Sequence, residues 1–282
     1  MTPDPELLRD VGYAKLNLAL HVRRRRADGY HDLETIFAFT ELGDGLSVAA
    51  ADTLSLRLAG DFAGAVPPGA DNLVLRAARA LDGGAGRGAA ITLDKRLPIA
   101  AGLGGGSADA AATLRLLNRL WRLDWPPERL AELGATLGAD VAACVHSRTL
   151  RGEAKGEALV AIDDSGLSGA TVILVNPRVA VPTPAVFARW DGVDRGPLAQ
   201  GDPVAAAASG RNDLEAPALG LAPMIGEVLA ALSALGGAQL VRMSGSGATC
   251  FALLANGHAA EAGAAALAAA HPGWWIAATR LR

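Results

Sequence analysis

Aromatic residues and cysteines are scarce in this chain of 282 residues, in which aromatics make up only 4%. Cys144 and Cys250 are its two cysteines, and each lies far from the other in an apolar stretch. That spacing excludes the patterns of a disulfide-stabilised secreted domain and of a zinc site. We expect both cysteines to be buried free thiols in a reducing cytosol.

A strong charge of one sign is also missing, because 26 Lys and Arg are set against 29 Asp and Glu, a net charge of −3. That balance does not predict nucleic-acid binding. The start, MTPDPELLRD, has no basic segment followed by an apolar one, so no signal peptide is expected. No long apolar run is free of charges and glycines, so no membrane span is expected either. We expect a cytoplasmic protein that binds neither membrane nor nucleic acid.

The one local cluster of like charge is the run of four arginines at 23–26, which a DG pair follows. Such a run fits a solvated hairpin turn, and it also fits a surface that steers an anionic ligand. The sequence leaves both interpretations open.

Hydrophobic residues make up 51% of the chain, enough for sizeable cores, and the length suggests about two domains. Residues 13–22 alternate so cleanly that they predict a half-buried strand, with Lys15 and Asn17 on one face. Capping and periodicity predict a helix over 71–84 that starts at Asp71 or Asn72 and another over 126–138. Alternating or branched apolar runs predict strands over 33–42, 45–50, 53–60, 89–98 and 170–177, and residues 192–213 read as a loop.

The stretch PIAAGLGGGSADAA, residues 98–111, places four glycines before an alanine-rich helix. It lacks the GK pair of a P-loop, and a serine stands where the dinucleotide fingerprint needs its third glycine. Consecutive glycines still allow several backbone amides to face one anion, and we expect Ser107 to cap the helix that follows. A phosphate is favoured at such a helix start, although a tight structural turn would look the same.

Three motifs together resemble the GHMP kinase family: the strand with Lys15, the loop PIAAGLGGGSA, and the glycine-rich MSGSGATCF at 243–251. The resemblance covers the chain from about Tyr13 to the C-terminus. It implies an α+β, two-domain fold, with a ribosomal S5-like domain over 1–163 and a ferredoxin-like domain over 164–282 that completes the substrate cleft. It also implies an ATP-dependent small-molecule kinase accompanied by Mg²⁺, either a monomer or a weak homodimer. Its metal ligands are not identified.

In that family the carboxylate of LGAD, here Asp140, is the general base, and the strand lysine, here Lys15, is its catalytic partner. Phosphoryl transfer needs both a proton acceptor and neutralisation of the phosphate charge. Without the resemblance, the local sequence indicates that Asp140 is a helix cap and that Lys15 is a solvated residue on an edge strand.

The stretches at 14–37, 137–145 and 181–187 narrow the resemblance to members that act on a cytidine diphosphate derivative of methylerythritol, in isoprenoid precursor synthesis. There, Tyr30 and Phe187 stack on the cytosine, His31 reads its edge and Thr183 lies nearby, while Asn17 supports the substrate. Flat, polar-tipped side chains suit that task, although they also suit a packed turn.

The resemblance assigns ATP binding to Asn72 near the adenine and to the loop around the phosphates. The loop residues so assigned are Pro98, Ala101, Gly102, Leu103, Gly104, Gly105, Gly106, Ser107 and Ala108. One departure stands at residues 153–157, EAKGE, where relatives often have a glycine in place of Ala154. A homoserine or mevalonate type of kinase, or a relative that binds nucleotide without catalysis, is the alternative.

Overall fold

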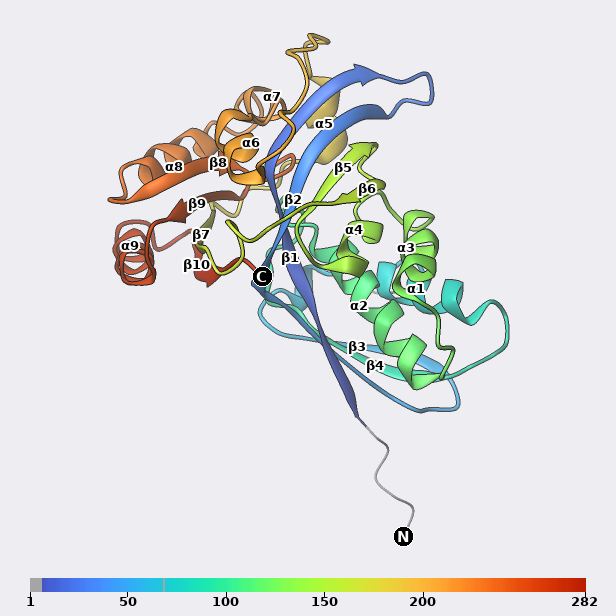
Figure 1. The fold of residues 1–282 in the computed structure, drawn as a ribbon. Helices are drawn as coiled ribbons and strands as arrows, with labels where there is room; N and C mark the ends of the chain where they lie inside the picture. Colours follow the sequence, from blue (N-terminus) through green and yellow to red (C-terminus); the bar gives the residue numbers. More distant parts are fainter. Residues whose placement is uncertain (1–6, 68) are drawn as a thin grey trace. The chain divides into compact units, whose positions relative to one another are not determined.

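A computed structural model describes residues 7–67 and 69–282 (Figure 1). Its contacts group them into two compact units, each built from separated stretches of chain. Unit 1 contains the residues up to Ala14, Gly43–Ile99 and Gly104–Ser147, and unit 2 contains Lys15–Leu42, Ala100–Leu103 and Arg148–Arg282. The strands β1 (Leu8–Arg25) and β2 (His31–Ala49) supply residues to both units.

In unit 1, the strand β3 (Leu54–Ala59) pairs in parallel with β4 (Ala89–Asp94), which is antiparallel to the last residues of β2. The predicted strands 33–42 and 45–50 are therefore one continuous strand. β4 ends at Asp94 rather than at Pro98, because the amides of Arg96 and Leu97 turn away to the carboxylate of Asp44.

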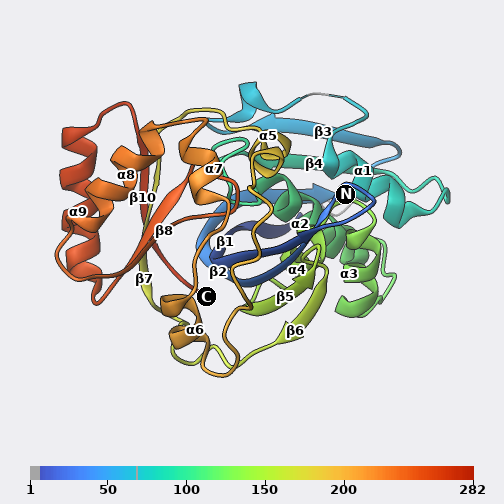
Figure 2. The same ribbon diagram turned by 90° about the horizontal axis from the view of Figure 1, so that it is seen from above.

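Four helices complete unit 1, and Figures 1 and 2 show them gathered on one side of β3 and β4. They are α1 (Leu73–Asp82), α2 (Gly105–Leu120), α3 (Pro127–Ala135) and α4 (Val141–His146). A short 3₁₀ helix, η1, spans Ala63–Ala65. The predicted cap of α1 is confirmed at Asn72, and Gly83 ends that helix in the left-handed conformation. α2 packs against α1 and α4, and its Ala110, Leu114 and Leu117 are fully buried.

Unit 2 contains an antiparallel sheet with the strand order β10-β7-β9-β8. Its strands are β7 (Thr171–Asn176), β8 (Ala238–Met243), β9 (Cys250–Leu254) and β10 (Trp275–Arg280). The helices α8 (Met224–Ser233) and α9 (Gly257–Ala270) pack on this sheet. The resulting β-α-β-β-α-β succession is the predicted ferredoxin-like arrangement.

The rest of unit 2 includes β5 (Leu150–Ala154), which pairs with the first residues of β2, and β6 (Ala158–Ala161) beside it. Ala154 has φ +58°, a left-handed conformation that glycine adopts more readily than alanine. The helices α5 (Thr183–Ala188), α6 (Pro203–Ser209) and α7 (Glu215–Leu219) follow β7. The expected loop 192–213 thus contains a helix, which Asp202 caps.

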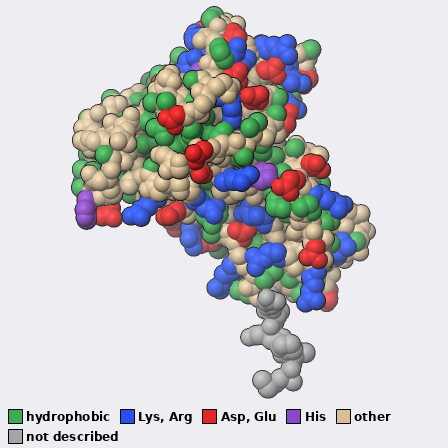
Figure 3. All heavy atoms as spheres, in the orientation of Figure 1, with side chains coloured by type: hydrophobic (Ala, Val, Ile, Leu, Met, Phe, Trp, Pro, Cys, Tyr) green, Lys and Arg blue, Asp and Glu red, His purple; other side chains and the backbone are tan. Residues whose placement is uncertain are grey.

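The arginine run lies in the hairpin between β1 and β2, where acidic and basic side chains crowd together at the top of Figure 3. Arg24 and Arg26 both pair with Asp32, while Arg23 pairs with Glu34 and Asp194. These carboxylates neutralise most of the run locally, which favours the hairpin interpretation over steering of an anionic ligand.

Candidate active site

The structure explains three of the four glycines in the glycine-rich loop. Gly102 and Gly104 have φ of +76° and +62°, which other residues adopt at a cost. A Cβ on Gly102 would also lie 2.3 Å from the carbonyl oxygen of Ser244, and one on Gly105 would lie 3.0 Å from Lys95 Nζ. Around Gly106, no described atom outside the helix's own backbone lies within 4 Å of the Cβ position. Nothing inside the protein therefore requires glycine at 106.

The expectation that Ser107 caps the helix is wrong. The left-handed conformation of Gly104 turns the chain into α2 early, so Gly104 is the N-cap and Ser107 is the third helical residue. The amides of the first turn therefore belong to Gly105, Gly106 and Ser107, and these are the groups that carry the partial positive charge of a helix start. The other predicted loop residues, Pro98, Ala101, Leu103 and Ala108, are buried.

Lys15 and Asn17 are buried on β1, with 4% and 2% of their surface exposed. The prediction of a half-buried strand is wrong here, because unit 2 covers both faces of the strand. Lys15 Nζ donates to Asn17 Oδ1 at 2.7 Å, and Asn17 Nδ2 donates to Thr35 Oγ1 at 2.8 Å. Thr35 had no sequence signal, because a threonine in a strand is common. The hydrogen bond to Asn17 holds the buried Lys15 side chain in a fixed position.

Within unit 2, the lysine strand, the first half of the glycine loop and the turn at 244–247 meet. Lys15 N donates to Leu103 O at 2.8 Å, and Asn17 N donates to Ser244 Oγ at 3.2 Å. Ser244 Oγ in turn donates to Gly102 O at 2.9 Å. Three motifs thus share one hydrogen-bond network, as a common site requires, and its bonds join residues that are 142 and 227 positions apart in sequence.

Asp140 precedes α4 in unit 1 and is partly exposed. Its side chain accepts no cap hydrogen bond from the amides of α4, whose residues are all described. The helix-cap interpretation therefore does not account for a carboxylate at this position.

His31 packs against Phe187 of α5, with ring centroids 4.9 Å apart, so these two predicted residues come together in unit 2. Trp190 meets the same imidazole edge-on at 5.6 Å, a neighbour that spacing alone could not reveal. Tyr30 is 57% exposed, and Lys155 Nζ lies 5.0 Å from its ring centroid. An exposed aromatic next to a packed aromatic pair offers a flat surface to a ligand.

Two other predicted residues hold the surrounding structure. Thr183 Oγ1 lies 2.7 Å from Ser246 Oγ, which links the start of α5 to the turn at 244–247. Asn72 accepts from Val74 N at 2.9 Å and donates from Nδ2 to Pro67 O at 3.2 Å. The cap interpretation of Asn72 is thus confirmed, and its place near adenine stays a prediction.

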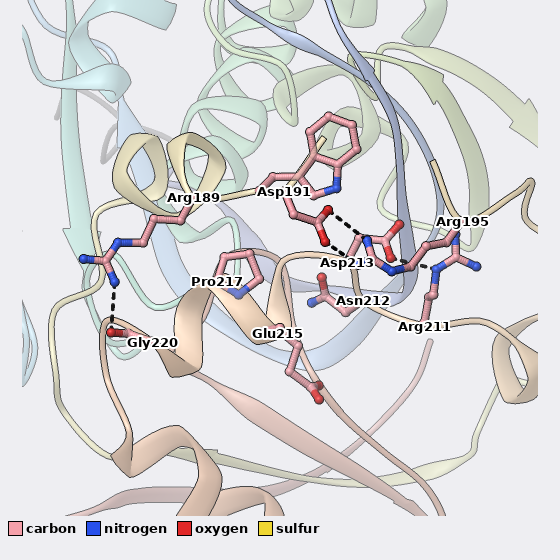
Figure 4. A pocket seen from close by; sticks show the side chains of 11 residues that line it. Arg189, Asp191, Arg195, Arg211, Asn212, Asp213, Glu215, Pro217 and Gly220 are labelled. Atoms are coloured by element: carbon pink, nitrogen blue, oxygen red, sulfur yellow. Dashed lines mark hydrogen bonds and ion pairs between the residues drawn. The ribbon is translucent and has the colours of Figure 1, made fainter. Parts of the chain in front are cut away.

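A cavity of about 640 Å³ opens in unit 2 between residues 189 and 220 (Figure 4). Its arginines already have partners: Arg195 pairs with Asp191, Arg211 with Asp213, and Arg189 donates to Gly220 O. None of the predicted site residues lines it. The residues predicted to bind the phosphates therefore do not form this cavity.

The pKa of His31 is lowered by burial and then by the nearby Arg25, and that of His21 by burial and then by Arg211. Folding thus favours the neutral imidazoles, so stability is lost as the pH falls below the unfolded-state pKa of about 6.5. We expect urea titrations between about pH 7.5 and 5 to show a shallower loss of unfolding free energy in His31→Gln than in wild type. Identical slopes would contradict the assigned neutral state of His31.

Comparison with known proteins places this chain in a family. The model of the GHMP kinases N terminal domain matches residues 72–148, and that of the GHMP kinases C terminal matches 199–273. A protein of Rhizorhabdus wittichii named 4-diphosphocytidyl-2-C-methyl-D-erythritol kinase is 58% identical, over 99% of this chain and 97% of its own length. The chain belongs to the GHMP kinase family. One of that same name from Sphingopyxis alaskensis is 51% identical to this GHMP kinase, over 98% and 99% of the two chains.

Solved structures agree. A crystal structure of 4-(cytidine 5'-diphospho)-2C-methyl-D-erythritol kinase matches with a TM-score of 0.80 and 36% identity, over 97% of this chain and 99% of that one. A homoserine kinase from Cytophaga hutchinsonii matches at a TM-score of 0.71 with 17% identity, a likeness of fold alone. The expected α+β fold of two GHMP kinase domains is confirmed, and the protein is an ATP-dependent small-molecule kinase.

No helix among residues 7–67 and 69–282 has the length and apolar character that crossing a membrane requires. Across the same ranges, no three His, Cys, Asp or Glu side chains are grouped closely enough to hold a metal ion.

Proposed function

We propose that this GHMP kinase transfers the γ-phosphoryl group of ATP to the 2-hydroxyl of 4-diphosphocytidyl-2-C-methyl-D-erythritol, in the non-mevalonate route to isoprenoid precursors. The observation that carries the proposal is the 58% identity, over almost the whole chain, to a relative named for that reaction. Homoserine and mevalonate kinases match at 17% and 12% identity, so they support the shared fold and not a shared acceptor.

The glycine-rich loop binds the phosphates of ATP in this proposal, through the first-turn amides of α2 and the loop before them. Gly106 supports the assignment. Its φ is not in the left-handed region and its surroundings are open, so an alanine would fit the folded protein and would favour the helix. Glycine at such a position leaves room for a group from outside the chain to approach the backbone.

We expect Gly106→Ala to weaken binding of a non-hydrolysable ATP analogue by about 10-fold or more, since the methyl group would keep a phosphate from the amides. Its unfolding free energy should stay equal or rise by up to about 1 kcal/mol. Titration calorimetry and urea unfolding measure the two effects. Gly236→Ala is the matched control, because Gly236 is equally open and lies in a turn of unit 2. Unchanged nucleotide affinity in Gly106→Ala would contradict the loop assignment.

Asp140 accepts the proton of the attacking hydroxyl, and Lys15 neutralises charge on the transferred phosphoryl group. For Asp140, the missing cap bond supports a role other than capping. For Lys15, the burial of its ammonium and its bond to Asn17 support a fixed position that surface solvation would not give. Asn17 then acts by holding the lysine as well as the substrate.

Tyr30, His31 and Phe187 bind the cytosine of the acceptor, with Thr183 beside them. The packing of His31 on Phe187 and the exposed ring of Tyr30 support this assignment. The imidazole Nε2 lies 3.3 Å from Arg25 Nε, which donates to it. A neutral His31 therefore carries its proton on Nδ1 and can donate it to an acceptor atom on the edge of a base.

We expect Phe187→Ala to weaken acceptor binding by about 1–3 kcal/mol, the usual worth of one aromatic stacked on a base. Nucleotide affinity should not change. Calorimetry with the acceptor and with the ATP analogue separates the two. Trp274→Ala provides the control, because Trp274 is an aromatic of the same unit that stacks on His271. Equal acceptor affinity in wild type and Phe187→Ala would argue against the cytosine site.

Mg²⁺ accompanies ATP in this proposal, and it is held chiefly by the nucleotide's own phosphates, as is usual for this ion. An ion held in this way needs no more than one or two carboxylate ligands from the protein.

We further propose a domain boundary at 163/164, a cytoplasmic location, and a monomer or weak homodimer that binds neither membrane nor nucleic acid.

A further inference from the structure

A charged cluster lies beneath the start of α2, wholly inside unit 1. It contains Lys95, Asp44 and Asp109, of which 2%, 0% and 3% of the surface is exposed. Lys95 Nζ donates to Asp109 Oδ2 at 2.8 Å and also to Asp44 Oδ2. Removing three ionisable groups from water costs free energy. None of the three has a role in the proposed phosphoryl transfer.

The cluster holds both ends of the glycine-rich loop. Asp44 Oδ1 accepts from Arg96 N at 2.6 Å and from Leu97 N at 2.8 Å, the amides just before the loop. Asp109 lies on α2, just after the loop. Lys95 is the link between the two carboxylates, so one ammonium connects the segment that leads into the loop with the helix that leaves it.

The packing leaves the ammonium little freedom. A Cβ on Gly105 would lie 3.0 Å from Lys95 Nζ, so the first residue of α2 rests directly on it. On the far side, a Cβ on Gly12 would lie 2.9 Å from Asp109 Oδ1. That oxygen is buried and has no hydrogen-bond partner among the described residues. A shift of the ammonium would therefore move the helix start.

This cluster fixes the position of the loop backbone and does not attract the phosphates by its charge. One ammonium faces two carboxyl groups, so the charges do not sum to a surplus of positive charge. Burial raises the pKa of Asp109 to about 8, although the nearby Lys95 acts to lower it. At pH 7 Asp109 is therefore mostly protonated, and the net charge of the cluster is close to zero. A neutral cluster attracts no anion from a distance, but its hydrogen bonds fix the backbone amides that do.

We propose that Lys95 is a positioning residue of the nucleotide site, which through Asp44 and Asp109 fixes the two ends of the glycine-rich loop in the form that binds phosphate. This inference rests on the proposed role of the loop in binding ATP. In this role the Lys95 side chain acts through the two carboxyl groups and not by its own contact with the nucleotide.

The test compares Lys95→Met with the double variant Lys95→Met/Asp109→Asn. The single variant leaves a buried carboxylate without its partner, so its melting temperature should fall. The double variant places at position 109 an amide that can donate a hydrogen bond to the remaining Asp44 carboxylate, so it should recover part of the loss. We expect both variants to show a KM for ATP raised by about 10-fold, with the KM for the acceptor within about 2-fold of wild type. Calorimetry with a non-hydrolysable ATP analogue should give the same ratio.

Asn118→Ala is the matched control. It lies on α2 at the opposite end from the loop and loses two hydrogen bonds to Trp125. It should lower the melting temperature without changing the KM for ATP. A double variant whose ATP affinity recovers together with its stability would overturn the proposal, because the effect would then be one of folding alone. Wild-type ATP affinity in a folded Lys95→Met would overturn it as well.

Gly106→Ala separates this proposal from the one on which it rests. If Gly106→Ala weakens nucleotide binding and the Lys95 variants do not, the loop assignment stands and the positioning role fails. If Gly106→Ala leaves nucleotide binding unchanged, the loop assignment itself fails. If Lys95→Met does not fold, the ATP affinity of the double variant is compared with that of wild type instead.

Discussion

Asp140→Asn should lower kcat by about 10²- to 10⁴-fold, the usual contribution of a positioned general base. The amide keeps the shape of the carboxylate but cannot take the proton of the attacking hydroxyl. The unfolding free energy of the variant is measured beside its activity, so that a fall in kcat of the folded protein can be assigned to the missing carboxylate. Steady-state assays with ATP and the cytidyl acceptor, together with urea unfolding, measure both quantities.

The binding of the two substrates distinguishes this role from others. A base that acts only in the transition state changes kcat and kcat/KM equally and leaves both KM values near those of wild type. Asp52→Asn, in the exposed turn between β2 and β3, makes the same chemical change away from the site and should keep full activity. Turnover within about 3-fold of wild type in Asp140→Asn would reject the assignment.

Lys15→Met should lower kcat by about 10²- to 10³-fold, the usual cost of losing one group that stabilises developing charge. Methionine has nearly the length of lysine and suits a buried position, so the loss should come from the missing ammonium and not from unfolding. Asn17 Oδ1 loses its donor in this variant, which should cost about 1–3 kcal/mol of stability. Thermal unfolding and steady-state kinetics measure the two effects.

Asn17→Ala separates the charge from the hydrogen bond. It keeps the ammonium and removes the oxygen that orients it, so kcat should fall less than in Lys15→Met. If the two variants lost the same activity at equal stability, the hydrogen-bond network would matter and the ammonium would not. That result, or near-wild-type turnover in Lys15→Met, would remove Lys15 from the catalytic groups.

The sequence predicted the order of elements well, because local signals set them: the Asn72 cap, the glycine after α1 and the alternation along β1. It misjudged the burial of β1. Alternation reveals a strand and its two faces, but it cannot show that both faces are covered by segments far away in the chain. Lys15 is therefore buried where a solvated lysine seemed the simpler interpretation.

The candidate site was predicted from motifs, and its supporting residues were not. Ser107 has the side chain of an ordinary helix cap, yet the left-handed Gly104 starts α2 before it. Thr35, Trp190 and Lys95 carry no signal of their own, since each acts through partners that are distant in sequence. Such partners become visible only when the fold brings them together.

Release of ADP from Mg-ATP in the presence of single acceptors shows directly which acceptor this kinase phosphorylates. The panel is 4-diphosphocytidyl-2-C-methyl-D-erythritol, homoserine and mevalonate, and the phosphorylated product is identified by mass and by its phosphorus spectrum. The account predicts rapid ADP release with the cytidyl acceptor, a new phosphomonoester on its 2-hydroxyl, and only background release with the other two. Phosphorylation of homoserine or mevalonate without reaction of the cytidyl compound would contradict it.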